Sequence, residues 1–157
     1  GGGQQDGIRA GTMPTFLCAG LAEALIETSD WIESGASADL TDRVQFLFQT
    51  LEAEIGIRYP ESIKIIGPET FTDRLPGNLT VLLPKKLDAS DLLMASSATF
   101  SASQGSACHS GQETASSSLR AIRVTDMEAR RIIRFGLGRD TMRSDVTTVV
   151  DEICRLI

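Results

Sequence analysis

Between residues 40 and 55 large apolar side chains recur every three or four positions, and this spacing restricts the fold more than any other feature of the chain. It places those side chains on one side of a helix that must be covered, so it predicts an amphipathic helix with Gly56 at its C-cap. Similar spacing predicts a helix from Pro14 to Ile32 and a closing helix from Val146 to Ile157. The apolar positions of the central helix are Leu40, Val44, Leu47, Leu51 and Ile55.

Between the central and closing helices the pattern changes to short runs rich in β-branched and apolar residues, most of them bounded by Pro or Gly. We expect strands at residues 63–66, 79–83, 98–102 and 132–137. The resulting order of helices and strands is typical of an α+β layered fold.

Three local signals complete the expected organisation. The segment from Asp88 to Ser96 predicts a short helix, and Thr125 with Glu128 forms a capping-box pattern that predicts the start of another. Residues 103–118 are rich in Ser, Gly and Ala and nearly lack large side chains, so we expect a loop outside the core.

Composition excludes several classes of function. The 157 residues carry 15 Lys and Arg against 21 Asp and Glu, and the sequence pI of about 4.8 argues against binding nucleic acid, which needs clustered positive charge. No apolar run approaches the roughly 20 residues that span a bilayer, so neither a membrane anchor nor a secretory signal is expected. Three cysteines without C-x-x-C spacing indicate neither a disulfide framework nor a metal site. We therefore expect a cytoplasmic protein, with a mitochondrial one left open.

The three cysteines lie in different settings. Cys18 and Cys154 have apolar neighbours and are predicted to act as small hydrophobic side chains in helices. Cys108 lies in the Ser- and Gly-rich loop, where an accessible thiol could serve as a nucleophile that reaches a substrate. An incidental cysteine in a linker is an equally good interpretation. His109, the only histidine, is expected to be an exposed loop residue, because adjacent side chains usually diverge and a Cys-His pair is poorly supported.

Arg134 and Thr12 are the candidate binding residues. Strand alternation places Arg134 on the face opposite Phe135, beside Gly136, which leaves room. A guanidinium binds a carboxylate through two hydrogen bonds, as amino-acid sites require, although a surface arginine paired with an acid would also fit. Thr12 precedes the first predicted helix, where its hydroxyl could contact a phosphate or simply cap the helix.

Three segments resemble motifs of the cysteine desulfurases and selenocysteine lyases. Residues 1–12 resemble their GGGQExGxRxGT segment, residues 103–108 their SxGSAC loop, and residues 133–139 their IRFSLGR strand. Ala107 to Ser110 reads A-C-H-S, which is closer to selenocysteine lyase than to the usual desulfurase. The chain departs from the motifs at positions without an assigned role, namely Gln5, Asp6, Met13, Pro14 and Gly136.

The resemblance implies a pyridoxal 5′-phosphate enzyme of fold type I, of which this chain forms the α+β small C-terminal domain, with a short, mostly antiparallel sheet packed by helices. Such an enzyme works as a homodimer, removes sulfur or selenium from L-cysteine or L-selenocysteine, gives alanine, and can pass the product to an acceptor protein. Cys108 corresponds to the loop nucleophile that becomes a persulfide, and Arg134 to the clamp for the substrate carboxylate. Thr12 corresponds to the threonine that reaches the other subunit's cofactor phosphate.

The family's cofactor-binding lysine lies in an S-x-H-K segment before the first motif, and none of the lysines here follows a histidine. The chain is therefore expected to be the C-terminal fragment of a longer enzyme, inactive alone. Residues 1–36 would be a remnant of the large domain with a linking helix, and residues 37–157 the small domain, with the mobile cysteine loop at about 103–118. The alternative is a non-catalytic dimerisation or partner-docking domain.

Overall fold

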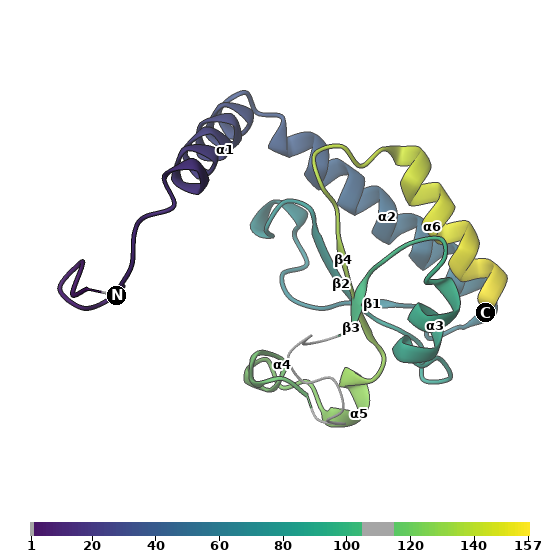
Figure 1. Cartoon of the computed structure of the whole chain (residues 1–157). Coiled ribbons are helices and arrows are strands. Elements are labelled where there is room, and N and C mark those ends of the chain that lie inside the picture. The colour runs from purple at the N-terminus through teal and green to yellow at the C-terminus, as the bar shows by residue number, and fades with distance from the viewer. Residues whose placement is uncertain (1, 105–114) are drawn as a thin grey trace. The chain divides into compact units, whose positions relative to one another are not determined.

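A computed structural model describes residues 2–104 and 115–157, and the chain divides into two compact units, 1–36 and 37–157 (Figure 1). The first unit holds one helix, α1 (Thr15–Glu33). The described part of the second unit holds helices and a four-stranded antiparallel sheet, which confirms the predicted α+β class. Its elements are α2 (Ser37–Arg58), β1 (Lys64–Ile65), η1 (Phe71–Asp73), β2 (Asn78–Leu82), α3 (Ala89–Ser96), β3 (Ser103–Gln104), α4 (Ser117–Ala121), α5 (Asp126–Ala129), β4 (Ile132–Gly136) and α6 (Arg143–Leu156).

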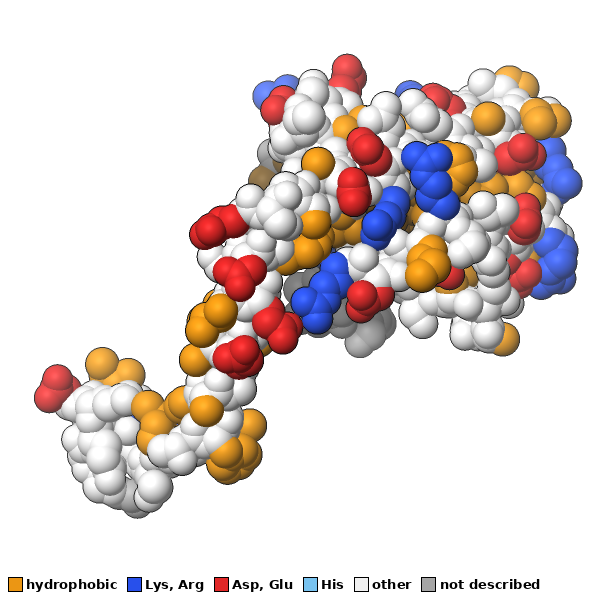
Figure 2. All heavy atoms as spheres, turned by 90° about the horizontal axis from the view of Figure 1, so that it is seen from above, with side chains coloured by type: hydrophobic (Ala, Val, Ile, Leu, Met, Phe, Trp, Pro, Cys, Tyr) orange, Lys and Arg blue, Asp and Glu red, His pale blue; other side chains and the backbone are white. Residues whose placement is uncertain are grey.

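Helix α1 confirms the helix predicted from residue 14 to 32, but none of its residues is buried. Six of its large apolar side chains are more than half exposed, and Figure 2 shows orange apolar and red acidic side chains along its surface. Cys18 is also exposed, so the prediction that it packs into a core is wrong for the described chain, because this unit holds no second element to cover it. The exposed apolar residues of α1 are Phe16, Leu17, Leu21, Leu25, Ile26 and Ile32.

The core of the second unit lies between one face of the sheet and three helices, α2, α3 and α6 (Figure 1). All five apolar positions predicted for the central helix are buried. The predicted C-cap at Gly56 is wrong, because α2 continues to Arg58 and Pro60 follows its end. Gly56 lies inside the helix, where Ser62 packs close to its backbone. The sheet face contributes Leu79, Val81, Ile133 and Phe135 to this core.

The sheet has the order β1-β2-β4-β3, so β4 lies between β2 and β3. Three of the four predicted strands are confirmed, but the one expected at residues 98–102 is wrong. Residues 97–100 instead form the turn that ends α3, in which the N–H groups of Thr99 and Phe100 donate to the Ser96 carbonyl at 2.8 and 3.1 Å. Strand pairing begins only at Ser103, so residues 103 and 104 are not part of the predicted loop.

The register between β2 and β4 depends on Gly77, which has a φ of +80°. Its carbonyl accepts a hydrogen bond from the Leu137 N–H at 2.7 Å, and a side chain at this position would overlap the Leu137 carbonyl oxygen and the Leu40 side chain. Only glycine combines that conformation with so close an approach. This contact fixes the ladder that places Thr80 opposite Arg134.

Described residues bury the opposite face of the sheet at one end. Ile132 and Leu82 are buried there although they lie outside the main core, and Ala115 is buried as well. Helix α4 begins at Ser117, so the end of the predicted loop is helical. The capping box predicted at Thr125 is confirmed at the start of α5. None of the described helices is long and apolar enough to cross a membrane.

Candidate functional site

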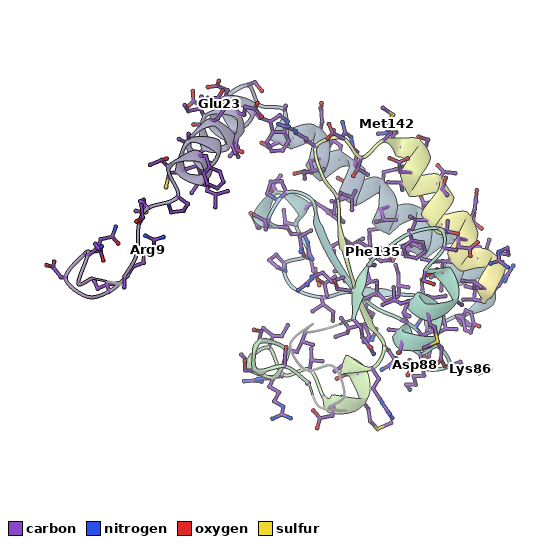
Figure 3. All side chains as sticks on the ribbon, viewed as in Figure 1. Arg9, Glu23, Lys86, Asp88, Phe135 and Met142 are labelled. Carbon is purple, nitrogen blue, oxygen red and sulfur yellow. The ribbon has the colours of Figure 1, made fainter. Side chains whose placement is uncertain are left out.

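Arg134 lies in the middle of β4, with a strand on each side. Its neighbours Ile133 and Phe135 point into the core, whereas Arg134 is exposed on the other face, which confirms the predicted alternation. Figure 3 labels Phe135 on this strand. Ile132 shares the face of Arg134 but is fully buried, so this face changes from covered to open at the arginine. The sheet thus holds the base of the side chain in place while its guanidinium reaches solvent.

The residues around Arg134 on this face are polar. Thr80 of β2 and Ser103 of β3 lie directly opposite it, one on each side, and both are half-buried. The next position along β2 on this face is Asn78, whose Oδ1 accepts a hydrogen bond from the Thr80 hydroxyl at 3.4 Å. Gly136 leaves open space, since a Cβ built there meets no atom within 4 Å. Among the described residues, no side chain therefore fills the space beside Gly136 on this face.

No hydrogen bond or ion pair joins the Arg134 guanidinium to another residue within 2–104 and 115–157. The alternative predicted from the sequence, an arginine paired with a surface acid, therefore has no support among these residues. Other arginines of the same unit do have partners. Arg131 donates to the Leu83 carbonyl at 2.8 Å, and Arg155 forms an ion pair with Glu152 at 2.6 Å. Arg134 combines a fixed position with five guanidinium donors that no described residue uses, which suits binding a carboxylate.

Cys108 and His109 lie outside the described residues, so the proximity of Cys108 to Arg134 stays a prediction. The two flanks of residues 105–114 are described, and both are anchored. On one side β3 pairs with β4, and the Gln104 side chain donates to the Arg130 carbonyl at 3.2 Å. On the other side the buried Ala115 donates its N–H to the Asp126 carboxylate at 2.8 Å. This bond is the main reason why the pKa of Asp126 lies below its ordinary value, and Arg120 lowers it further.

Thr12 lies in the first unit, in an irregular segment before α1. Its neighbours hold a compact turn, in which the Gln4 side chain accepts from the Gly11 N–H at 3.2 Å and Arg9 donates to the Gly11 carbonyl at 3.1 Å. Figure 3 shows Arg9 in this segment. The Thr12 side chain is exposed and does not cap α1, whose N-cap is Pro14. The interpretation of Thr12 as a helix cap is therefore wrong, and its hydroxyl is available to a ligand.

The remaining reactive side chains do not form a second site in the described part of the chain. Cys154 is partly buried against the core, as predicted, and burial raises the pKa of its thiol. All three lysines are exposed, and Lys85 pairs with Glu61 at 3.8 Å. Figure 3 places Lys86 beside the start of α3. No group of three or more metal-ligating side chains occurs among residues 2–104 and 115–157.

A small hollow on the core side of β4 is lined mainly by apolar side chains, among them Phe100, Phe135 and Leu137. Its one charged residue, Asp145, uses a carboxylate oxygen to accept the Met142 N–H at 2.8 Å at the start of α6. Because Phe135 and Arg134 point to opposite faces of the sheet, this hollow is not part of the Arg134 face. No local pattern in the sequence singles out Asn78 and Thr80, whose place beside Arg134 follows only from the strand register.

Comparison with known proteins shows which proteins are similar to this chain in sequence. No family model matches the chain. A cysteine desulfurase of a Frankia species is 34% identical over 158 residues, which cover 100% of this chain and 36% of that protein. A selenocysteine lyase of Rattus norvegicus is 31% identical and covers 98% of this chain and 34% of that protein. The chain thus spans about a third of the length of these relatives.

Two solved structures share the fold. A NifS-like protein superposes with a TM-score of 0.76 at 22% sequence identity, over 99% of this chain and 37% of that one. A NifS-like protein from Rickettsia africae gives a TM-score of 0.69 at 23% identity and covers 97% of this chain. In both cases nearly the whole of this chain matches about a third of a longer one.

Proposed function

We propose that this chain, a member of the cysteine desulfurase and selenocysteine lyase family that matches the C-terminal part of its relatives, is the C-terminal part of a pyridoxal-phosphate-dependent enzyme. That enzyme removes sulfur or selenium from L-cysteine or L-selenocysteine and releases alanine. The observation that carries the proposal is the exposed guanidinium of Arg134, held on the central strand β4 without a partner among the described residues.

Arg134 binds the substrate carboxylate in this proposal. The planar guanidinium offers two parallel N–H donors that match the two oxygens of a carboxylate, and it keeps its charge at any physiological pH. Arg134 lies on a strand that is paired on both sides, so little conformational freedom is lost when the amino acid binds. The side chain therefore determines where the reacting sulfur lies.

Cys108 is the proposed sulfur acceptor. Its thiolate attacks the substrate sulfur, a new S–S bond forms as the carbon–sulfur bond breaks, and the sulfur remains on Cys108 as a persulfide. Bound pyridoxal phosphate supplies the electron sink for the substrate carbon during this exchange. Support comes from the Ser- and Gly-rich sequence around Cys108 and from the anchored flanks at Gln104 and Ala115, which fix both ends of a segment that must reach the substrate.

This chain does not provide a complete cofactor site. It offers the Thr12 hydroxyl for the cofactor phosphate, but none of its lysines follows a histidine, as the cofactor-binding lysine of the family does. Lys85 and Lys86 lie before α3, and Lys64 lies on the edge strand β1 opposite Leu82. We infer that residues 1–36 belong to the large domain and that residues 37–157 form the small domain. The exposed apolar side chains of α1 support this division, because they need further polypeptide to cover them.

The proposed assembly is a cytoplasmic homodimer in which Thr12 serves the cofactor of the other subunit. An acceptor protein would then take the product from Cys108. Whether sulfur or selenium is the element transferred is decided by assaying the full-length enzyme with both amino acids.

The test is Cys108→Ala in the full-length enzyme, with Cys18→Ala as the matched control. Cys108→Ala is expected to abolish sulfur transfer while cofactor absorbance is retained, whereas Cys18→Ala should behave as the unaltered enzyme. Undiminished persulfide formation in Cys108→Ala would contradict the proposal. If the full-length polypeptide carries no S-x-H-K segment and binds no cofactor, the alternative holds, and the chain is a non-catalytic dimerisation or partner-docking domain.

A further inference from the structure

The geometry points to Thr80 of β2 as a second residue that binds the substrate carboxylate, through a hydrogen bond from its hydroxyl to the group that Arg134 holds. The inference rests on the proposed function and extends it by a residue to which no role has been assigned. It is carried by the strand register, by the Arg134 donors that no described residue uses and by the hydrogen bonding of Thr80 itself.

The ladder between β2 and β4 shows how close these two side chains lie. In an antiparallel sheet the N–H and C=O of one residue point to the same neighbouring strand. The Thr80 carbonyl accepts from the Ile66 N–H at 2.9 Å, on the side of β1. The backbone of Thr80 therefore makes no ladder bond to β4, although Arg134 is its direct partner there.

Bonds at the two ends of this ladder give the same pattern. The Leu83 N–H donates to the Arg131 carbonyl at 2.8 Å, and the Leu137 N–H donates to the Gly77 carbonyl at 2.7 Å. Ladder bonds thus fall on the odd-numbered residues of both strands. Thr80 and Arg134 form a non-hydrogen-bonded pair, with Cα atoms about 4.5 Å apart and side chains at their closest.

Ser103 on the other side of Arg134 is less well placed. Because the backbone of Arg134 points away from β2, it points toward β3, and its pair with Ser103 is of the hydrogen-bonded type, with Cα atoms about 5.5 Å apart. Side chains in such a pair are farther from each other. Thr80 is therefore the hydroxyl that shares a ligand with Arg134.

The hydrogen bonding of Thr80 leaves its hydroxyl free to turn to a ligand. It donates to Asn78 Oδ1 at 3.4 Å, which is long for a bond between oxygens. A carboxylate oxygen is a stronger acceptor than an amide oxygen, and it can accept from the guanidinium and the hydroxyl together. Gly136 leaves the approach open. Arg134 supplies the charge, and Thr80 fixes which way the carboxylate is turned.

The test compares two ligands in the cofactor-loaded full-length enzyme by isothermal titration calorimetry. L-alanine carries the carboxylate, and ethylamine has the same amine and methyl group without it. Thr80→Val keeps the branched shape that suits a strand but removes the hydroxyl. It is expected to raise the Kd of L-alanine about tenfold, the effect of losing one hydrogen bond to a charged group. The Kd of ethylamine should not change, and Thr80→Ser should restore L-alanine binding.

The possible outcomes separate this inference from the proposed function. If Thr80→Val leaves the Kd of L-alanine unchanged, or weakens both ligands equally, Thr80 has no role toward the carboxylate. Thr80→Ala provides the same comparison if the valine variant fails to fold. If the unaltered enzyme does not prefer L-alanine to ethylamine, or if Arg134→Lys leaves that preference intact, the proposed role of Arg134 fails as well.

Discussion

Replacing Arg134 with lysine tests the proposed site while leaving the fold intact. The variant keeps the positive charge but loses the planar fork that binds both carboxylate oxygens. Because the Arg134 side chain is exposed and has no partner among the described residues, the change removes no hydrogen bond or ion pair with any of them. The free energy of unfolding should therefore stay within about 0.5 kcal/mol of the unaltered protein.

The effect on catalysis follows from the hydrogen bonds lost. A hydrogen bond between charged groups contributes about 1.5 to 3 kcal/mol. Since each 1.4 kcal/mol corresponds to a factor of ten, kcat/KM for L-cysteine should fall by roughly ten- to a hundredfold in the full-length enzyme. The assay measures alanine release against substrate concentration, together with urea denaturation of the same samples.

Arg155→Lys is the matched control, because Arg155 is also exposed but lies on α6 and pairs with Glu152. It should leave kcat/KM unchanged. Loss of kcat/KM in both variants, or a loss of stability in Arg134→Lys that accounts for its lower activity, would refute the reasoning. An unchanged kcat/KM in Arg134→Lys would show that another group binds the carboxylate.

Two further predictions concern the frame around the site. Gly77→Ala should lower the free energy of unfolding by about 2 kcal/mol or more in urea denaturation, because residue 77 has a positive φ and an added Cβ would overlap Leu137 and Leu40. Gly138→Ala is the control, since position 138 has open space around it and the free energy of unfolding should change little. Equal effects of the two substitutions would contradict the role of Gly77 in the register. The Ala115 N–H lowers the pKa of Asp126 in the folded chain. The ionised carboxylate therefore stabilises the fold above the unfolded pKa of about 3.9, and this stabilisation is lost as the pH falls through the lower folded pKa. Asp126→Asn should therefore flatten the fall of the urea midpoint below about pH 4, and an unaltered pH profile would argue against the anchor at Ala115.

The sequence predicts the core of the second unit well, because helical spacing and burial agree at every apolar position of α2. It fails where a local signal competes with a tertiary contact. Gly56 looks like a helix end, but Ser62 packs beside it and the helix runs on to Arg58. The alternation at residues 98–102 involves mostly small side chains, and the hydrogen bonds that close α3 override it.

The site is predictable in part. Strand alternation is enough to expose Arg134, because its neighbours on both sides are large and apolar. Its position opposite Thr80 cannot be obtained in the same way, since the register depends on a close contact between Gly77 and Leu137 that no local pattern encodes. Apolar spacing also predicts α1 correctly but does not reveal what covers it. The role of Cys108 stays a prediction.

The most direct test of the central claim is to find the transferred sulfur. After the full-length enzyme has reacted with L-cysteine and been alkylated, peptide mass spectrometry should locate one additional sulfur atom on the peptide that contains Cys108. The same sulfur should be much reduced in Arg134→Lys, where the substrate is no longer oriented. Sulfur found on Cys18 or Cys154 instead of Cys108 would contradict the account. So would an equal amount of sulfur on Cys108 in the unaltered enzyme and in Arg134→Lys.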